Sequence, residues 1–146
     1  MHQEIVRVVS SFSRPLQLVV RPHPNEMLRN PLPFEEQARL DAAYQEWLTR
    51  QGVTSARLMR GDKIAAIRAA DVVLITGQSS LIAEAMILQR PVVTLEHDLN
   101  ALPTFTAEDG IIALRDWSQL RSTLESLLSD AQARAAIVER QNACPS

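Results

Sequence analysis

The chain of 146 residues is long enough for one domain with a buried core, and its formal net charge is −2 at pH 7. A charge this close to neutral gives no electrostatic attraction to nucleic acid or to an anionic membrane, so we expect no nucleic-acid partner. No apolar run reaches 18 residues and no signal peptide is recognisable, so we expect no transmembrane segment and a cytoplasmic location. The single cysteine, Cys144, excludes an internal disulfide and fits a reducing compartment.

Hydrophobic patterning predicts short apolar strands that alternate with helices. The expected strands are residues 16–20, 56–59, 72–75, 92–95 and 111–114. The expected helices are residues 3–11, 35–50, 62–70, 81–88, a helix opened by residues 116–119, and residues 131–141. This alternation predicts an α/β fold, a Rossmann-like parallel sheet of about five strands with helices on both faces, in a single domain over residues 1–146.

Residues 71–95 organise the expected site, because they are typical of a strand, a tight turn, a short helix and a second strand. Gly77 breaks the apolar run of the first strand, and Ser79 and Ser80 then supply two helix-capping hydroxyl groups. The free N–H groups and the dipole of a helix N-terminus attract anions, and the hydroxyl groups add donors there. Glu84 follows Ser80 by about one helical turn, so its carboxylate is expected on the same side as the turn.

A second polar turn, RPHPNE, follows the strand at residues 16–20. Ligands of parallel sheets bind outside the carboxyl ends of the strands, so this turn, the GQSS turn and residues 96–98 are expected on one rim. His23 is either a turn residue or a ligand contact, and Arg21 either pairs with Glu26 or neutralises phosphate. Residues 96–98 are adjacent and converge poorly on one ion, so no metal site is expected.

Two nucleotide-binding motifs are absent from the sequence. It contains neither GxGxxG nor GxxxxGK[ST], which excludes a dinucleotide fingerprint and a P-loop. Any phosphate contact would therefore be made by the serine-rich turn, without a lysine.

The RPHPNE turn, followed about fifty residues later by ADVVLITGQSSLIAEAMILQRPVV, resembles the C-terminal, nucleotide-binding half of GT-B-fold enzymes. The most similar groups are UDP-N-acetylglucosamine 2-epimerase-like proteins, CDP-glycerol glycerophosphotransferases and capsule or sialic acid transferases. The resemblance covers roughly residues 16–95. It implies that the two serines contact phosphate oxygens, that the helix glutamate accepts hydrogen bonds from ribose hydroxyls, and that the histidine lies near the nucleotide. The candidate nucleotide-binding residues are Arg21, His23, Gly77, Gln78, Ser79, Ser80 and Glu84.

The resemblance also implies a function. The chain is expected to bind the nucleotide-diphosphate part of a UDP-, CDP- or CMP-linked donor, without another cofactor, as the donor half of a glycosyltransferase of surface polysaccharide synthesis. Residues 77–80 read Gly-Gln-Ser-Ser where the epimerases have Asp-Ser-Gly-Gly, which favours a transferase. The alternatives are a UDP-N-acetylglucosamine 2-epimerase-like enzyme and a non-catalytic α/β interaction or regulatory domain.

The sequence departs further from the family at its start. The C-terminal domain of these enzymes begins with a central strand, which here would lie between residues 16–20 and 72–75, and this sequence lacks it. Most catalytic acids and bases of the family belong to an N-terminal domain. We therefore expect a missing N-terminal GT-B domain as a partner, self-association at the exposed gap, and no turnover by this chain alone.

Overall fold

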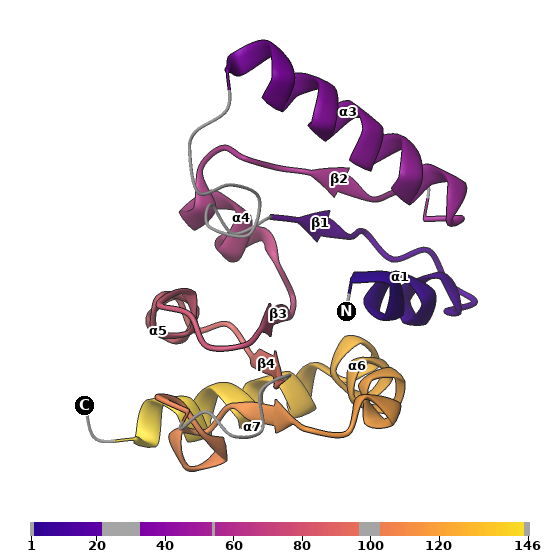
Figure 1. The fold of residues 1–146 in the computed structure, drawn as a ribbon. Coiled ribbons are helices and arrows are strands. Elements are labelled where there is room, and N and C mark those ends of the chain that lie inside the picture. Colours follow the sequence, from indigo (N-terminus) through magenta and orange to yellow (C-terminus); the bar gives the residue numbers. More distant parts are fainter. Residues whose placement is uncertain (1, 22–32, 54, 97–102, 145–146) are drawn as a thin grey trace. The chain divides into compact units, whose positions relative to one another are not determined.

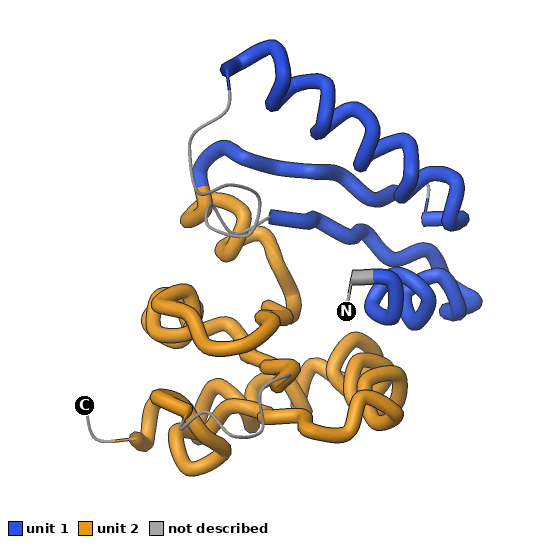
Figure 2. Tube along the Cα trace, viewed as in Figure 1, with its two compact units in different colours: residues 1–62 blue, residues 63–146 orange. Residues whose placement is uncertain are grey.

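The computed structural model describes residues 2–21, 33–53, 55–96 and 103–144, and it shows an α/β protein. The chain divides into two compact units, residues 1–62 and residues 63–146 (Figure 2). The first unit holds a parallel sheet of two strands and the second a parallel sheet of three (Figure 1). The predicted α/β class is confirmed, whereas the single five-stranded sheet and the single domain stay predictions.

The first unit contains both helices that the sequence predicts there, and strands shorter than predicted. Its elements are α1 (His2–Ser10), β1 (Val19–Val20), α3 (Phe34–Arg50) and β2 (Arg57–Leu58). The ladder extends one residue past the strand ends, since Arg57 N–H donates to the Leu18 carbonyl and Met59 N–H to the Val20 carbonyl, both at 2.9 Å. The backbone pairing of β1 with β2 is limited to these few residues, so both strands are short.

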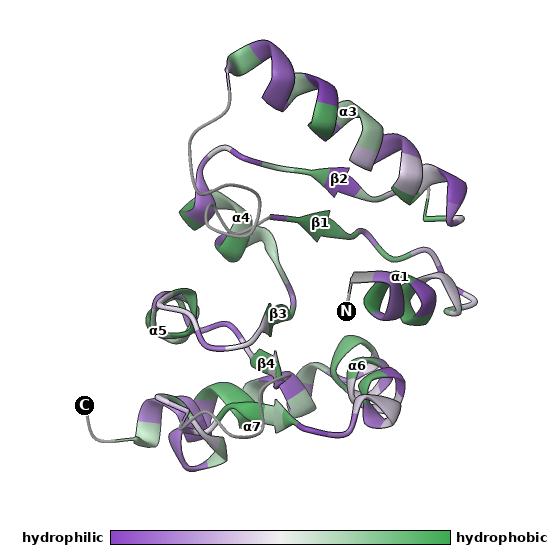
Figure 3. Cartoon of the chain, viewed as in Figure 1, coloured by the Kyte–Doolittle hydropathy of each residue, from purple (hydrophilic) through white to green (hydrophobic). Residues whose placement is uncertain are grey.

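Amphipathic helices build the core of the first unit. Hydrophobic and hydrophilic residues alternate around α3 (Figure 3), and Leu48 of this helix is fully buried. Val6 and Val9 of α1 belong to the same buried cluster. Gln45 ties α3 to β2, because its amide donates to the Ala56 carbonyl at 2.6 Å and accepts from the Leu58 N–H at 2.9 Å.

The second unit follows the predicted order of elements closely. They are α4 (Lys63–Ala69), β3 (Val73–Thr76), α5 (Leu81–Ile87), β4 (Val92–Leu95), the 3-10 helix η1 (Ala107–Asp109), β5 (Ile112–Leu114), the 3-10 helix η2 (Trp117–Gln119), α6 (Leu120–Ser129) and α7 (Ala131–Ala143). The strand order is β3-β4-β5, all parallel. The central strand β4 is buried along its whole length, as expected for a parallel sheet covered on both faces.

Apolar side chains of the sheet and of α5 pack into one buried cluster. It joins Ile75 of β3 and Val92 of β4 to Ile82 and Ala85 of α5, with Ile111 at the start of β5. Full burial of an aliphatic side chain of this size stabilises the folded state by about 1.5–3 kcal/mol. This packing fixes α5 against the sheet, and with it the turn between β3 and α5.

Two of the expected helices follow a capping aspartate. The Asp116 carboxylate accepts from the Ser118 N–H, and the Asp130 carboxylate accepts from the Gln132 N–H, each at 2.9 Å. The helices expected from the sequence do not include η1, which is closed by a capping box between Thr106 and Asp109.

A long apolar helix is the element that would cross a membrane. Of the helices in the described part of the chain, none combines the length and the apolar character that such a crossing requires.

Candidate functional site

The turn of residues 77–80 lies at the carboxyl edge of the three-stranded sheet. Gly77 continues the ladder, since its N–H donates to the carbonyl of Leu95, the last residue of β4, at 2.8 Å. Its φ of +75° is a left-handed conformation that glycine adopts without steric cost. Gly77 therefore turns the chain out of β3 while the turn stays anchored to β4.

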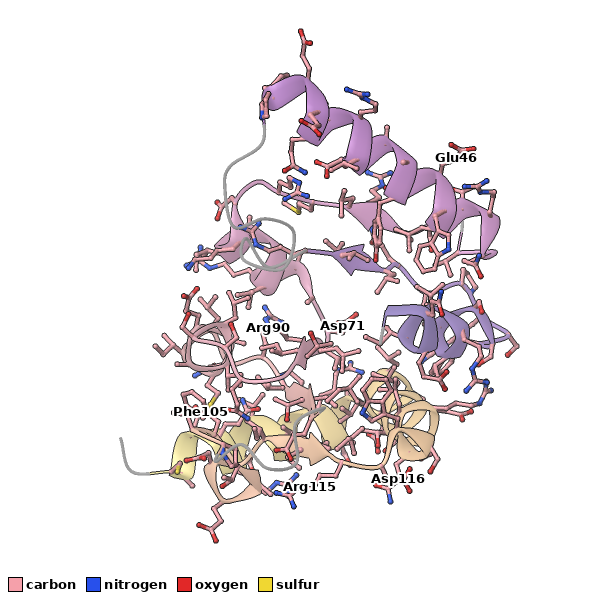
Figure 4. All side chains as sticks on the ribbon, viewed as in Figure 1. Glu46, Asp71, Arg90, Phe105, Arg115 and Asp116 are labelled. Carbon is pink, nitrogen blue, oxygen red and sulfur yellow. The ribbon has the colours of Figure 1, made fainter. Side chains whose placement is uncertain are left out.

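Gln78 is held by the backbone of a distant segment. Its side-chain oxygen accepts from the N–H of Phe105 at 3.1 Å, and its side-chain nitrogen donates to the carbonyl of the same residue at 3.3 Å (Phe105 is labelled in Figure 4). Both polar ends of the amide thus bond the polypeptide. Gln78 therefore joins the turn of residues 77–80 to the segment that precedes η1.

The two serines of the turn behave differently from each other. The Ser79 hydroxyl accepts from the Leu81 N–H at 3.2 Å, which is the capping role that the sequence predicts. Ser80 is already in a right-handed helical conformation and makes no cap hydrogen bond with its side chain, so its predicted capping role is wrong. Its side chain is exposed, which leaves the Ser80 hydroxyl open to a ligand.

Glu84 lies in the first turn of α5 and forms an ion pair with Lys63. Its backbone N–H donates to the Ser80 carbonyl at 3.3 Å, which confirms the predicted spacing of one helical turn. The Lys63 ammonium donates to Glu84 Oε1 at 2.8 Å, and the two side chains are 44% and 26% exposed. Lys63 is the first residue of α4, so this pair joins two helices of the second unit.

The second carboxylate oxygen of Glu84 has no hydrogen-bond partner among the described residues. Glu84 Oε2 is buried and accepts no hydrogen bond in the described part of the chain. Leaving a polar atom buried without a hydrogen bond costs roughly 1–3 kcal/mol, and more for a charged group. The carboxylate is therefore only half satisfied, next to a turn that carries a free hydroxyl group.

A second ion pair lies at the ends of the neighbouring strands. Arg115 follows β5 and donates to Glu96 Oε2 at 2.9 Å (Figure 4). The Glu96 side chain is only 10% exposed, yet neither of its oxygens is buried without a partner. The indole N–H of Trp117 donates to the Glu96 carbonyl at 3.3 Å. Among the described residues, the buried side-chain atoms without a partner are Glu84 Oε2, Arg90 Nε and Thr94 Oγ1, so Glu84 Oε2 is the one carboxylate oxygen of this group.

The remaining candidate residues belong to the first unit. Arg21 is exposed and donates from its guanidinium group to the carbonyl of Gly61. His23 lies outside the described residues, and so does Glu26, the expected partner of Arg21. The structure thus brings together Gly77, Ser79, Ser80 and Glu84, and it gives Arg21 a local contact.

The opposite edge of the sheet carries a hollow of about 330 Å³. Asp71, Arg90 and Pro91, which precede β3 and β4, line it together with residues of α7. Asp71 and Arg90 are labelled in Figure 4. The hollow therefore lies at the amino ends of the strands, away from the turn of residues 77–80.

The described surroundings of the lone thiol, Cys144, disfavour its thiolate form. Burial raises the pKa of the Cys144 thiol, and the neighbouring Asp109 carboxylate raises it further. Cys144 Sγ lies 3.5 Å from Asp109 Oδ1. A thiol with a raised pKa carries less thiolate at neutral pH and is a poorer nucleophile.

Comparison of the chain with protein-family models, with curated proteins and with solved structures finds no match. The site is therefore interpreted from its own chemistry and from the resemblance noted in the sequence.

Sequence reasoning missed Lys63 at this site. The sequence predicts phosphate contacts without a lysine, because it contains no lysine-bearing phosphate-binding motif. Lys63 and Glu84 are 21 positions apart, and no periodic pattern connects residues on two different helices. One signal was present in the sequence: Lys63 is the single lysine among 15 basic residues.

Proposed function

We propose that the chain binds the nucleotide-diphosphate part of an activated sugar or a CDP-alcohol, as the donor half of a cytoplasmic glycosyltransferase of surface polysaccharide synthesis. The Rossmann-like sheet of five strands expected from the sequence is part of the same proposal. The acceptor site and the catalytic acids and bases would belong to an N-terminal GT-B domain, so binding without turnover is expected of this chain.

The observation that carries the proposal is the half-satisfied carboxylate of Glu84. Glu84 lies on the first turn of the helix that follows β3; one of its oxygens bonds Lys63, and the other lacks a donor in the part of the chain that the structure describes. A carboxylate accepts hydrogen bonds and does not donate them, so its missing partner is a donor such as a sugar hydroxyl. The last torsion of a glutamate side chain is soft, and a small rotation brings either oxygen to such a donor.

The serine turn supports the same ligand. The exposed Ser80 hydroxyl lies one helical turn before Glu84, and helical side chains lean toward the N-terminus of their helix. A ligand with a hydroxyl that donates a hydrogen bond to Glu84, and a phosphate oxygen that accepts one from Ser80, would use both side chains. The ribose and phosphates of a nucleotide offer this combination.

The test is thermal and urea unfolding of the full chain in the presence of UMP, UDP, CMP, CDP and UDP-N-acetylglucosamine. A ligand at one hundred times its dissociation constant stabilises the folded state by about 2.7 kcal/mol. We expect stabilisation by a nucleotide with one base, and loss of this effect in Glu84→Gln. The variant Glu125→Gln removes one carboxylate from an exposed position of α6 and is the matched control.

Two outcomes contradict the proposal. If no nucleotide stabilises a chain that unfolds cooperatively, the interaction-domain alternative is favoured. If a nucleotide stabilises the native chain and Glu84→Gln equally, a ligand binds elsewhere and the role of Glu84 is wrong.

A further inference from the structure

We propose that Lys63 is a ligand-binding residue, which together with Glu84 recognises an anionic oxygen and a hydroxyl of one phosphorylated sugar. This inference rests on the proposed function and adds to it the positive charge that the serine turn lacks. It follows from the ion pair of the two side chains.

The ammonium group of Lys63 has donors to spare. A lysine carries three N–H donors, and the described contacts of Lys63 use one of them, on Glu84 Oε1. The side chain is 44% exposed, so the other donors are within reach of a ligand. An oxyanion is the group that this arrangement accepts best, because a charge-assisted hydrogen bond is shorter and stronger than a neutral one.

The Glu84 side of the pair shows why the arrangement is more than a bond between two helices. At Lys63 and Glu84 the ion pair satisfies one carboxylate oxygen, and the other is buried without a donor among the described residues. A ligand that draws the ammonium toward its own anionic oxygen frees the carboxylate for a hydroxyl donor.

The ligand chemistry follows from the two groups together. Lys63 and Glu84 are in direct contact, so the anionic oxygen and the hydroxyl must lie close together in the ligand. Phosphorylated sugars and nucleotides carry this pair of groups, whereas inorganic phosphate offers the anion without a sugar hydroxyl and a nucleoside offers the hydroxyls without the anion. We therefore expect UDP or CDP to bind more tightly than inorganic pyrophosphate, and the corresponding nucleoside to bind least.

A single lysine permits a direct measurement. Reductive methylation with ¹³C-formaldehyde labels Lys63 and the α-amino group, and it retains the positive charge of the lysine. The dimethylated ammonium keeps only one N–H donor, so the label reports the approach of an anion to the charge, and affinities are measured on the unlabelled chain. We expect the Lys63 methyl resonance to shift saturably with UDP or CDP and to stay in place with the nucleoside. The α-amino resonance is the internal control in each titration.

Variants separate binding from folding. Lys63→Met is expected to weaken nucleotide binding about tenfold or more, and Lys63→Arg to retain most of it. Because Lys63→Met leaves Glu84 without its partner, the charge swap Lys63→Glu with Glu84→Lys is measured beside it. The swap keeps an ion pair between the helices but moves both groups, so we expect loss of binding, and native binding by the swapped chain would overturn the roles of both residues. Arg7→Met removes an exposed cation from a different glutamate pair and is the matched control.

The two proposals fail in different ways. If UDP or CDP binds the native chain and Glu84→Gln abolishes binding, while the Lys63 resonance does not move and Lys63→Met binds normally, the inference about Lys63 is overturned and the proposed function stands. If the nucleotides bind neither the native nor the methylated chain, the proposed function is overturned and this inference with it.

Discussion

Gln141 provides a sharp test of how α7 is attached to the sheet. The side chain is 4% exposed, its oxygen accepts from the Val92 N–H at 3.0 Å, and its nitrogen donates to the Arg90 carbonyl at 2.9 Å. Leucine has a similar volume but no polar atoms. Gln141→Leu therefore leaves a backbone donor and a backbone acceptor without partners and opens little space.

The size of the effect follows from these two orphaned groups. Each costs about 1–3 kcal/mol when it is left buried without a hydrogen bond. Allowing for partial relaxation, we expect Gln141→Leu to lower the free energy of unfolding by about 2–4 kcal/mol. With a urea dependence of about 1.5 kcal/mol per M, typical of a small protein, the unfolding midpoint falls by roughly 1.3–2.7 M.

Each unit carries one tryptophan, which makes the measurement specific. Trp47 lies in the first unit and Trp117 in the second, so Trp47→Phe leaves a fluorescence signal from the second unit and Trp117→Phe one from the first. Gln132→Leu, at an exposed position on the same helix, is the matched control. If the free energy of unfolding of Gln141→Leu lies within about 0.5 kcal/mol of that of the Gln132→Leu control, the two hydrogen bonds do not hold α7 in place.

The same pair of signals tests the predicted single domain. If the units unfold independently, Gln141→Leu shifts the transition reported by Trp117 and leaves that reported by Trp47 unchanged. If both transitions shift together, residues 1–146 unfold as one cooperative domain.

Two further predictions concern backbone geometry and acid stability. Gly110→Ala is expected to unfold the second unit in mild urea, because Gly110 has φ +83° and a β-carbon there would lie 2.5 Å from the carbonyl carbon of Arg140; native-like urea unfolding would contradict this contact. Asp41→Asn is expected to lower stability by about 0.5–1 kcal/mol at pH 7, because the hydrogen-bonded Arg60 guanidinium holds the pKa of Asp41 below its usual range. A carboxylate whose pKa is lower in the folded than in the unfolded state stabilises the fold above its unfolded pKa, and this stabilisation is lost as the pH falls. The difference in unfolding free energy between Asp41→Asn and the native chain, followed with Trp47, should therefore shrink below about pH 4. A difference that stays constant with pH would exclude the ion pair as its cause.

Local patterns in the sequence were enough to predict the helices and most strands. Leu120, Leu124 and Leu127 recur at helical spacing, and all three are buried in α6. Asp116 and Asp130 precede helices and cap them, because a short polar side chain reaches its own backbone two residues on. These features depend on residues close together in the chain, which is why the sequence alone reveals them.

Contacts between distant segments were not predictable in the same way. Gln141 meets residues about fifty positions earlier, and Gln78 bonds Phe105, which is 27 positions later. A glutamine in a helix or a turn has the same sequence appearance whether it is exposed or bonds a remote backbone. The burial of Gln141 follows from the packing of α7 against the start of β4, and no periodicity records that packing.

Glu84 lies between these two cases and shows how far sequence reasoning reaches at the site. A carboxylate within an apolar helix must have a donor, because burying it unpaired costs several kcal/mol, and this argument already marks Glu84 as unusual. The sequence could not say which residue supplies the donor, since Lys63 is on another helix. The structure identifies Lys63 for one oxygen and none of the described residues for the other. The described residues therefore meet the physical requirement that singled out Glu84 for one oxygen, and the proposed ligand hydroxyl would meet it for the other.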